Sequence, residues 1–346
     1  MASDVHHEKG SGVHHEKRNG LGKIGQQWIF CLTKKRYSVS HLLVVIGTFV
    51  TYMTIRSWYC NGAIQPSCCS DQINIPGLLT NWTKPTYHFE SNKPVPKMVH
   101  FCWYGGLRRT NFRFYHLISV LSAYKHIKPS VIYFWYDYIP QGALWRDVLK
   151  RVPIMKLKHR PAPTHTYHRS LGRYDQHQSD VVRLEVLMEF GGIYMDLDVV
   201  ALKSFDPLLE FDTTMGYEDR NRLCNGIIIS KPNAPFLRLW HLEYATFDDN
   251  SWAFHSVELP AILAETYPRI IHTEERSLHR PNWKEWRWMY KTGMLYDWSK
   301  NFAVHLFYIH TLGLTEHSPE SIKKLDTTMG QIFRYIYYGS KEFVQD

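Results

Sequence analysis

The chain has 346 residues, a formal net charge of +9 and a sequence pI of about 9.1. A net positive charge of this size can indicate nucleic-acid binding. No nucleic-acid recognition motif accompanies it, so we expect no nucleic-acid partner. The positive charge instead suits anionic ligands or an anionic membrane surface.

Residues 1–37 are predicted to form a disordered cytosolic tail. They carry an eight-residue repeat, with Val-His-His-Glu-Lys at 5–9 and again at 13–17, and few residues that could build a core. Two pairs of histidines could hold a transition metal, but the composition favours a solvated tail, and we assign it no function.

Residues 38–59 are predicted to be a transmembrane signal anchor. The run from Val39 to Ile55 is apolar and lies near the lower limit of about 17 residues for a spanning helix. Three basic residues precede it at 34–36 and only Arg56 follows directly, so the positive-inside rule places the N-terminus in the cytosol. This pattern predicts a single-pass type II protein with a lumenal main domain; a buried core helix is the alternative.

Residues 60–95 are predicted to be a lumenal stem, because they are rich in Pro, Asn, Ser and Cys and lack a sustained hydrophobic period. Asn81 begins the sequon that we expect to carry an N-glycan. Five cysteines would be lumenal, so at least one stays free or pairs with another chain. Cys102 and Cys224 are interpreted as core positions, which leaves open a disulfide-linked homodimer through the stem cysteines 60, 68 and 69.

Residues 96–340 are predicted to form one α/β domain, followed by a short tail at 341–346. The stretch 97–106 is interpreted as a buried strand that ends in a glycine turn, and 131–137 as a second strand. A predicted helical segment at 112–126 lies between the two strands. The order strand, helix, strand predicts a βαβ unit in a mainly parallel sheet. Ligands of such sheets bind beyond the carboxyl ends of the strands.

The most informative stretch runs from 179 to 198. Apolar residues at helical spacing follow Ser179, which is predicted to cap the helix, and a glycine pair stops it. The hydrophobic period then changes to two, which places Asp196 and Asp198 on one face of a strand, roughly 7 Å apart. Two such carboxylates suit a hard divalent cation, which prefers oxygen ligands.

Later strands carry further polar residues. Asn225 begins an Asn-Gly pair at the start of a predicted buried strand. The alternative to a functional role is that the pair forms an ordinary turn before the strand. Glu218 and Asp219 come just before it, and they are the carboxylates that a covalent intermediate would use. His305 lies in an apolar strand, where a satisfied core histidine is the alternative to a ligand.

The pattern S-D-x-x-R followed by G-G-x-Y-x-D-x-D, from Ser179 to Asp198, resembles the signature of glycosyltransferases with a DXD sugar-binding region. These are retaining enzymes related to globotriaosylceramide synthase, α-1,4-N-acetylglucosaminyltransferase and the yeast initiating mannosyltransferases. The run V-P-K-M-V-H at 95–100, with Trp103, resembles the nucleotide-contacting edge of the same family. The run A-V-H-L-F at 303–307 resembles its late A-V-H-x-W motif, with Phe in place of the usual Trp.

The resemblance implies a single GT-A-type nucleotide-sugar-binding domain with a Rossmann-like, mainly parallel sheet. It implies that Asp196 and Asp198 hold Mn²⁺ or Mg²⁺, with His305 as a third ligand or a diphosphate contact. It places Asn225 beside the reacting centre. The expected donor-binding residues are Asp180, Arg183, Tyr194 and Trp103. A surface ion pair is the alternative for Asp180 and Arg183, and simple strand packing for Tyr194.

We therefore expect a Golgi glycosyltransferase that moves a hexose or N-acetylhexosamine, with retention, from a UDP- or GDP-sugar to a glycolipid or glycoprotein glycan. The alternative is an inactive relative that acts as a lumenal sugar-binding or partner subunit. A glycoside hydrolase is a poorer hypothesis, because carboxylates two apart on one strand do not flank a sugar ring from opposite sides. Three tryptophans and a tyrosine could stack on sugar rings or simply pack: Trp283, Trp286, Trp288 and Tyr290.

Overall fold

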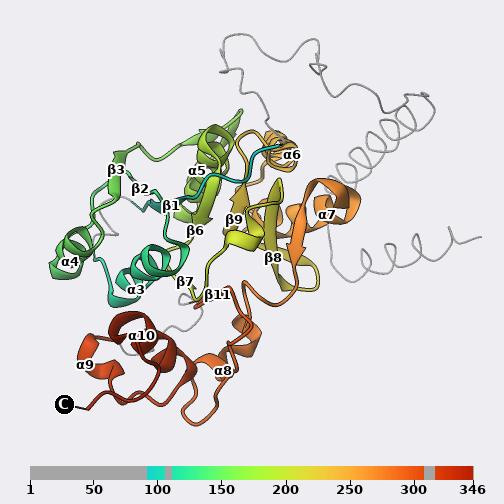
Figure 1. Ribbon diagram of the computed structural model, residues 1–346. Coiled ribbons are helices and arrows are strands. Elements are labelled where there is room, and N and C mark those ends of the chain that lie inside the picture. The colour runs from blue at the N-terminus through green and yellow to red at the C-terminus, as the bar shows by residue number, and fades with distance from the viewer. Residues whose placement is uncertain (1–91, 106–110, 308–315, 346) are drawn as a thin grey trace, which may run out of the picture. The chain divides into compact units, whose positions relative to one another are not determined.

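The computed structural model describes residues 92–105, 111–307 and 316–345 (Figure 1). These residues belong to a compact unit that spans Thr83–Asp346. The predicted tail, anchor and most of the stem, with Asn81, lie outside the described residues. Among the helices that are described, none is long and apolar enough to cross a membrane.

The unit is built on a seven-stranded sheet with the strand order β10-β8-β9-β6-β1-β2-β3. Strand β9 is antiparallel to both neighbours, and the other four strand pairs are parallel. The predicted α/β domain with a mainly parallel sheet is therefore confirmed. The strands are β1 (Met98–Trp103), β2 (Val131–Tyr136), β3 (Met155–His159), β6 (Gly192–Met195), β8 (Thr213–Asp219), β9 (Arg222–Ser230) and β10 (His272–Glu274).

Two short two-stranded sheets accompany it. One pairs β7 (Val199–Ala201) with β11 (Ala303–His305) and the other pairs β4 (His165–Thr166) with β5 (Arg169–Ser170), both antiparallel. The β7–β11 pair draws the late A-V-H segment to the chain that directly follows β6. Two motifs that are about a hundred residues apart in sequence therefore lie next to each other.

The first βαβ unit forms where the sequence predicts it. Strands β1 and β2 run parallel in register, with Met98 opposite Val131. Between them lie α3 (Phe114–Ser122) and a π-helical turn, η2 (Ala123–Ile127). Strand β1 supplies apolar residues to both faces of the sheet, as expected of a strand covered on both sides.

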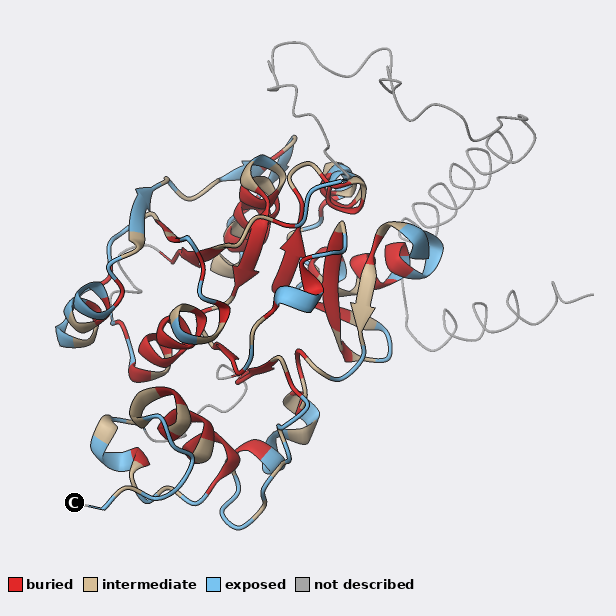
Figure 2. Cartoon of the chain, viewed as in Figure 1, coloured by how far each residue is buried: buried red, intermediate tan, exposed pale blue. Residues whose placement is uncertain are grey.

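Helices cover both faces of the sheet (Figures 1 and 2). One hydrophobic cluster joins the sheet to α3, α4 (Ala143–Arg151) and α10 (Thr328–Tyr338). A second cluster joins the opposite face to α5 (Asp175–Phe190), α6 (Pro235–Glu243) and α7 (Leu259–Thr266). The shorter helices are η3 (Asp206–Leu208), η4 (Tyr244–Thr246), η5 (Phe254–Glu258), η6 (Pro268–Ile270), η7 (Trp283–Glu285), α8 (Trp286–Tyr290) and α9 (Pro319–Ile322).

Helix α5 begins more than a turn earlier than the sequence predicts. It starts at Asp175, so Ser179 lies inside the helix and does not cap it. The first turn is held by a tertiary contact: buried His177 lies 2.7 Å from a carboxylate oxygen of Asp249 and packs edge-on to Phe247. Such a contact joins residues far apart in sequence, and local spacing does not reveal it.

The predicted glycine break after α5 is confirmed. The backbone φ angles of Gly191 and Gly192 are +65° and +105°, which side-chain-bearing residues rarely adopt. A Cβ atom on Gly192 would also lie 2.8 Å from the carbonyl oxygen of Met98 on β1. Glycine at this position therefore lets β6 enter the sheet directly beside β1.

Candidate active site

Asp196 and Asp198 lie in a turn after β6, so the prediction that they share one continuous strand is wrong. The backbone N–H of Val199 donates to the carbonyl oxygen of Asp196 at 3.0 Å, which closes the turn. The chain leaves the main sheet after Met195 and pairs with β11 from Val199 onward. Both carboxylates still follow the carboxyl end of β6, where open α/β sheets bind ligands.

Three other elements hold this turn. The backbone N–H of Asp196 donates to the carbonyl of Gly226 on β9 at 2.8 Å, and that of Leu306 donates to the carbonyl of Asp198 at 2.8 Å. From α3, the hydroxyl of Ser119 donates to the carbonyl of Asp196 at 3.3 Å. The backbone that carries the two carboxylates is thus fixed before any ligand arrives.

His305 lies beside the two carboxylates, the position that the family resemblance implies. Its Nε2 atom lies 3.1 Å from Oδ1 of Asp198, and ligand atoms of all three residues lie within 4.8 Å of one another. Burial lowers the pKa of His305, but the charges of Asp198, Asp196 and Glu218 outweigh burial and raise it. Two carboxylates and an imidazole fit a divalent cation such as Mn²⁺, which accepts both oxygen and nitrogen ligands.

Gly226 makes room for this group. A Cβ atom at position 226 would lie 2.9 Å from Cε1 of His305 and 3.1 Å from Oδ2 of Asp196. Any side chain there would push the imidazole away from the carboxylate. The Asn-Gly pair does not open its strand as predicted; it lies inside β9, at an irregularity in the pairing with β8. Glycine at 226 therefore leaves room for His305 and Asp196.

Arg183 lies between two carboxylates. It donates through Nη1 to the carbonyl of Asn225 at 2.7 Å, and its Nη2 lies 3.2 Å from Asp180 and 3.3 Å from Asp196. Both Asp180 and Arg183 are 4% exposed, so the alternative of a surface ion pair is wrong. Arg183 is a buried, fixed positive charge beside the Asp196–Asp198–His305 group.

Asn225 completes this arrangement. Its Nδ2 donates to Oδ1 of Asp180 at 2.8 Å, the same oxygen that faces Arg183. Burial raises the pKa of Asp180, and Arg183, His177 and the hydrogen bond from Asn225 act against that rise. The structure thus brings together Asp180, Arg183 and Asn225, which the sequence places on a helix and a distant strand.

Tyr194 lies beneath the same group. Its hydroxyl donates to Oδ1 of Asp196 at 2.5 Å, and the Arg183 guanidinium lies 4.4 Å from the centre of its ring. Tyr194 is 1% exposed, so its ring face is covered by the protein. The structure therefore gives this tyrosine a role in positioning Asp196 and Arg183.

Comparison with known proteins identifies the family. A family described as "Glycosyltransferase sugar-binding region containing DXD motif" matches residues 125–215, which contain Asp180, Arg183, Tyr194, Asp196 and Asp198. The chain is also 33% identical over 279 residues to "Glucan organizing enzyme 1" of Cryptococcus neoformans var. grubii, covering 72% of this chain and 75% of that protein. The chain belongs to the DXD glycosyltransferase family.

Other matches are more distant. "Inositol phosphoceramide mannosyltransferase 3" of Schizosaccharomyces pombe is 26% identical over 148 residues, which cover 41% of this chain and 35% of that protein. Among solved structures, mouse xyloside xylosyltransferase 1 matches with a TM-score of 0.42 and 9% identity, covering 61% of this chain and 98% of that one.

In this DXD glycosyltransferase, Trp103 does not join the Asp196 group. It is 1% exposed and packs against Phe112, His116 and Phe134, in the hydrophobic cluster on the α3 side of the sheet. Tyr194 belongs to the cluster on the opposite face. Side chains alternate along β1, so the end of that strand turns Trp103 into the core. Its donor contact stays a prediction from the family resemblance.

Two further residues beside the site, Cys224 and His279, are not identified by the sequence analysis. Cys224 and Cys102 are free and buried, which confirms their interpretation as core positions. The Sγ atom of Cys224, however, also lies 3.4 Å from Nδ1 of His305. His279 is fully buried nearby, and neither of its ring nitrogens has a hydrogen-bond partner among the described residues. Cys224, His279 and His305 thus form a second, softer group of ligand atoms within 4.8 Å.

The carboxylates predicted for a covalent intermediate are held by other partners. Glu218 is buried beside Arg222 and Cys224, and burial raises its pKa. Asp219 pairs with Lys284 at 2.5 Å, and this hydrogen bond lowers its pKa. Each carboxylate therefore already has a cationic partner, Arg222 for Glu218 and Lys284 for Asp219.

Proposed function

We propose that this DXD glycosyltransferase transfers a hexose or N-acetylhexosamine, with retention, from a UDP- or GDP-sugar to a glycolipid or glycoprotein glycan, assisted by Mn²⁺ or Mg²⁺. The proposal rests above all on one observation. Asp196, Asp198 and His305 converge within 4.8 Å, beside the buried guanidinium of Arg183. These four residues come from two parts of the chain, 183–198 and 305, that are about a hundred residues apart.

Asp196, Asp198 and His305 would hold the cation. A divalent cation bound there supplies positive charge against the diphosphate leaving group. Arg183 adds a permanent positive charge and keeps Asp196 in place. Because Arg183 is also tied to the backbone of Asn225, the electrostatic field of the site is set before the donor binds.

Retention is proposed without a covalent enzyme intermediate. Glu218 lies buried against Cys224 and its pKa is raised, while Asp219 is engaged by Lys284. Both carboxylates are already paired with cationic side chains, Glu218 with Arg222 and Asp219 with Lys284. We therefore favour delivery of the acceptor hydroxyl on the face of the sugar from which the diphosphate departs.

A donor panel tests the activity. The full-length chain should release nucleoside diphosphate from one of UDP-glucose, UDP-galactose, UDP-N-acetylglucosamine or GDP-mannose in the presence of Mn²⁺. Slow hydrolysis of the donor is sufficient for this measurement, so the acceptor need not be known. Binding of each donor is measured by calorimetry in parallel. A chain that binds a donor but releases nothing from any of the four would support the inactive-relative hypothesis instead.

We also propose that residues 38–59 anchor the chain in the Golgi membrane and that residues 60–95 form a lumenal stem, with a disulfide-linked homodimer through stem cysteines left open. In cells, Asn81 should then carry an N-glycan. Asn81→Gln should increase electrophoretic mobility by the same amount as glycosidase treatment of the wild type. A wild-type chain whose mobility glycosidase does not change would contradict the lumenal orientation.

A further inference from the structure

A second group of ligand atoms lies beside the carboxylates, and the proposed reaction does not use it. The group consists of Sγ of Cys224 on β9, the imidazole of His279 in the turn after β10, and the imidazole of His305 on β11. One ligand atom from each residue lies within 4.8 Å of the other two, and all three residues are buried. We call these residues the Cys224–His279–His305 group.

His279 has polar atoms that the surrounding protein leaves unsatisfied. The side chain is fully buried, yet neither ring nitrogen has a hydrogen-bond partner among the residues that the structure describes. An unpaired buried polar atom lowers the stability of a fold, and such atoms are rare unless a ligand, an ion or a water meets them. The ring centre of His279 lies 5.6 Å from that of His305. A cation bound between the two rings would therefore satisfy a nitrogen of each.

The position of His279 is fixed by the chain around it. From the segment just before β11, Nδ2 of Asn301 donates to the carbonyl of the next residue, Arg280, at 2.7 Å. On β8, a Cβ atom at Gly216 would lie 2.8 Å from Cδ2 of His279. Glycine at 216 therefore lets the imidazole approach the strand that pairs with β9, which carries Cys224.

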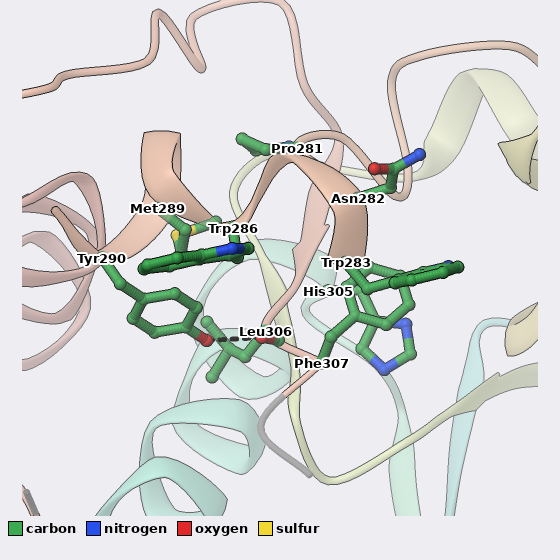
Figure 3. A pocket seen from close by; sticks show the side chains of 9 residues that line it. All are labelled: Pro281, Asn282, Trp283, Trp286, Met289, Tyr290, His305, Leu306 and Phe307. Carbon is green, nitrogen blue, oxygen red and sulfur yellow. Dashed lines mark hydrogen bonds between the residues drawn. The ribbon is translucent and has the colours of Figure 1, made fainter. Parts of the chain in front are cut away.

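His305 presents one nitrogen to each set of ligands. Its Nε2 lies 3.1 Å from Oδ1 of Asp198, and its Nδ1 lies 3.4 Å from Sγ of Cys224. Phe307 stacks on the imidazole with ring centres 3.9 Å apart, which fixes the orientation of the ring (Figure 3). A histidine that binds a metal through one nitrogen commonly donates its other N–H to a carboxylate. His305 and Asp198 have this relation, with Nδ1 as the metal-binding atom.

The distances fit a tetrahedral zinc ion. With Zn–S near 2.3 Å and Zn–N near 2.0–2.1 Å, a sulfur and a nitrogen on one zinc ion lie about 3.6 Å apart. The 3.4 Å between Cys224 and His305 is close to this value, and a side-chain movement of about 1 Å brings in His279. One thiolate and two imidazoles favour Zn²⁺, whereas Mg²⁺ and Mn²⁺ prefer carboxylate and water oxygens.

We propose that Cys224, His279 and His305 form a zinc site whose fourth position is open to water or another small ligand. Burial raises the pKa of Cys224, so the thiol is neutral in the metal-free protein. Binding forms one S–Zn bond and two N–Zn bonds, and the thiol proton passes to solvent. The remaining N–H of His305 donates to Asp198, whose negative charge helps to balance the buried cation.

Because His305 is shared, the zinc site and the Asp196–Asp198 site should oppose each other. A neutral imidazole has one nitrogen that accepts and one that donates, so it binds one cation at a time. Zn²⁺ at Nδ1 leaves Nε2 protonated and unable to ligate the cation that Asp196 and Asp198 hold. This consequence rests on the proposed function, whereas zinc binding itself does not.

The absorption of Co²⁺ tests the site without turnover. Co²⁺ enters tetrahedral zinc sites, and a cysteine thiolate bound to it gives a charge-transfer band in the near ultraviolet that oxygen and imidazole ligands do not give. The reduced full-length chain should develop this band when Co²⁺ is added. Added Zn²⁺ should remove the band, because Zn²⁺ has no preference for another geometry to give up. A folded wild type without the band would overturn the site.

Three variants assign the band, each with its fold checked by circular dichroism. Cys224→Ser should abolish it. His279→Leu is similar in volume and removes nitrogens that have no partner, so it should fold and should bind Co²⁺ at least about tenfold more weakly. Cys102→Ser, at the other buried free thiol, is the matched control and should behave as wild type. A band that Cys224→Ser or His279→Leu leaves at wild-type strength and affinity would overturn the site.

Inhibition by Zn²⁺ tests the coupling through His305. Donor hydrolysis is measured at half-saturating Mn²⁺ as Zn²⁺ is added, relative to the uninhibited rate of each protein. Direct entry of Zn²⁺ between the carboxylates affects wild type and His279→Leu alike. The Zn²⁺ concentration for half inhibition should therefore rise in His279→Leu by about the factor by which it loses Co²⁺ affinity. Equal inhibition of the two proteins would overturn the coupling. A wild type that shows the Co²⁺ band but releases no nucleotide would contradict the proposed function alone.

Discussion

Asp198→Asn should leave a folded protein with at most about 1% of wild-type turnover. The substitution is nearly isosteric, and the backbone of Asp198 stays bonded to Leu306. It removes one negative charge from the group formed by Asp196, Asp198 and His305. Loss of one preorganised electrostatic stabiliser typically lowers turnover by on the order of 100- to 1000-fold. The measurement is the rate of nucleoside diphosphate release at saturating donor and Mn²⁺.

Asp147→Asn is the control for that variant. Asp147 pairs with Arg151 on the surface of α4 at 3.0 Å, so its loss tests the removal of a carboxylate without touching the site. Exposed pairs of this kind contribute about 0–1 kcal/mol to folding, and we expect turnover within twofold of wild type. An Asp198→Asn protein that kept more than a tenth of wild-type turnover would show that this carboxylate is not needed for the reaction.

Arg183→Lys should lose roughly 100-fold in turnover and about 1–3 kcal/mol in free energy of unfolding. The guanidinium serves the carbonyl of Asn225 and the carboxylates of Asp180 and Asp196 at the same time. A lysine ammonium is a single point and cannot keep this forked set of contacts. Turnover is measured as for Asp198→Asn, and unfolding by chemical denaturation.

Arg151→Lys, at an exposed arginine of α4 that contacts Asp147 and Tyr337, is the matched control: we expect turnover within twofold of wild type and a loss of at most about 1 kcal/mol in free energy of unfolding. The two readouts for Arg183→Lys separate its roles. Reduced stability with unchanged donor affinity and turnover would mean that Arg183 only supports the fold. Loss of turnover with only a small change in stability would locate its contribution in the transition state.

The sequence predicts the features that depend on local pattern. Strand β1, helix α3 and strand β2 appear where the hydrophobic runs and turns place them, and the glycine pair ends α5. The convergence of Asp196, Asp198 and His305 follows from motifs whose family resemblance links residues far apart in the chain. The strands and the glycine break are therefore readable from the single sequence, whereas the convergence at the site is implied only by the resemblance.

Other features depend on contacts that no local pattern encodes. The turn at Asp196 forms because β7 pairs with β11, more than a hundred residues later, and this pairing interrupts the alternation that the sequence predicts. Gly226 leaves the space that His305 and Asp196 occupy, so its role appears only once the site is assembled. Cys224 and His279 look like ordinary core residues in the sequence. The hydrophobic pattern predicts that a side chain is buried, but not which atoms it contacts.

Wild-type turnover in excess chelator is the most direct test of the metal group formed by Asp196, Asp198 and His305. The full-length chain is assayed for nucleoside diphosphate release with its active donor, first in excess EDTA and then after Mn²⁺ is supplied beyond the chelator. We expect turnover to fall to about 1% or less in EDTA and to return with Mn²⁺, whereas Asp198→Asn should stay low in both conditions. Full wild-type turnover in excess EDTA would contradict a metal site at these carboxylates and the mechanism built on it.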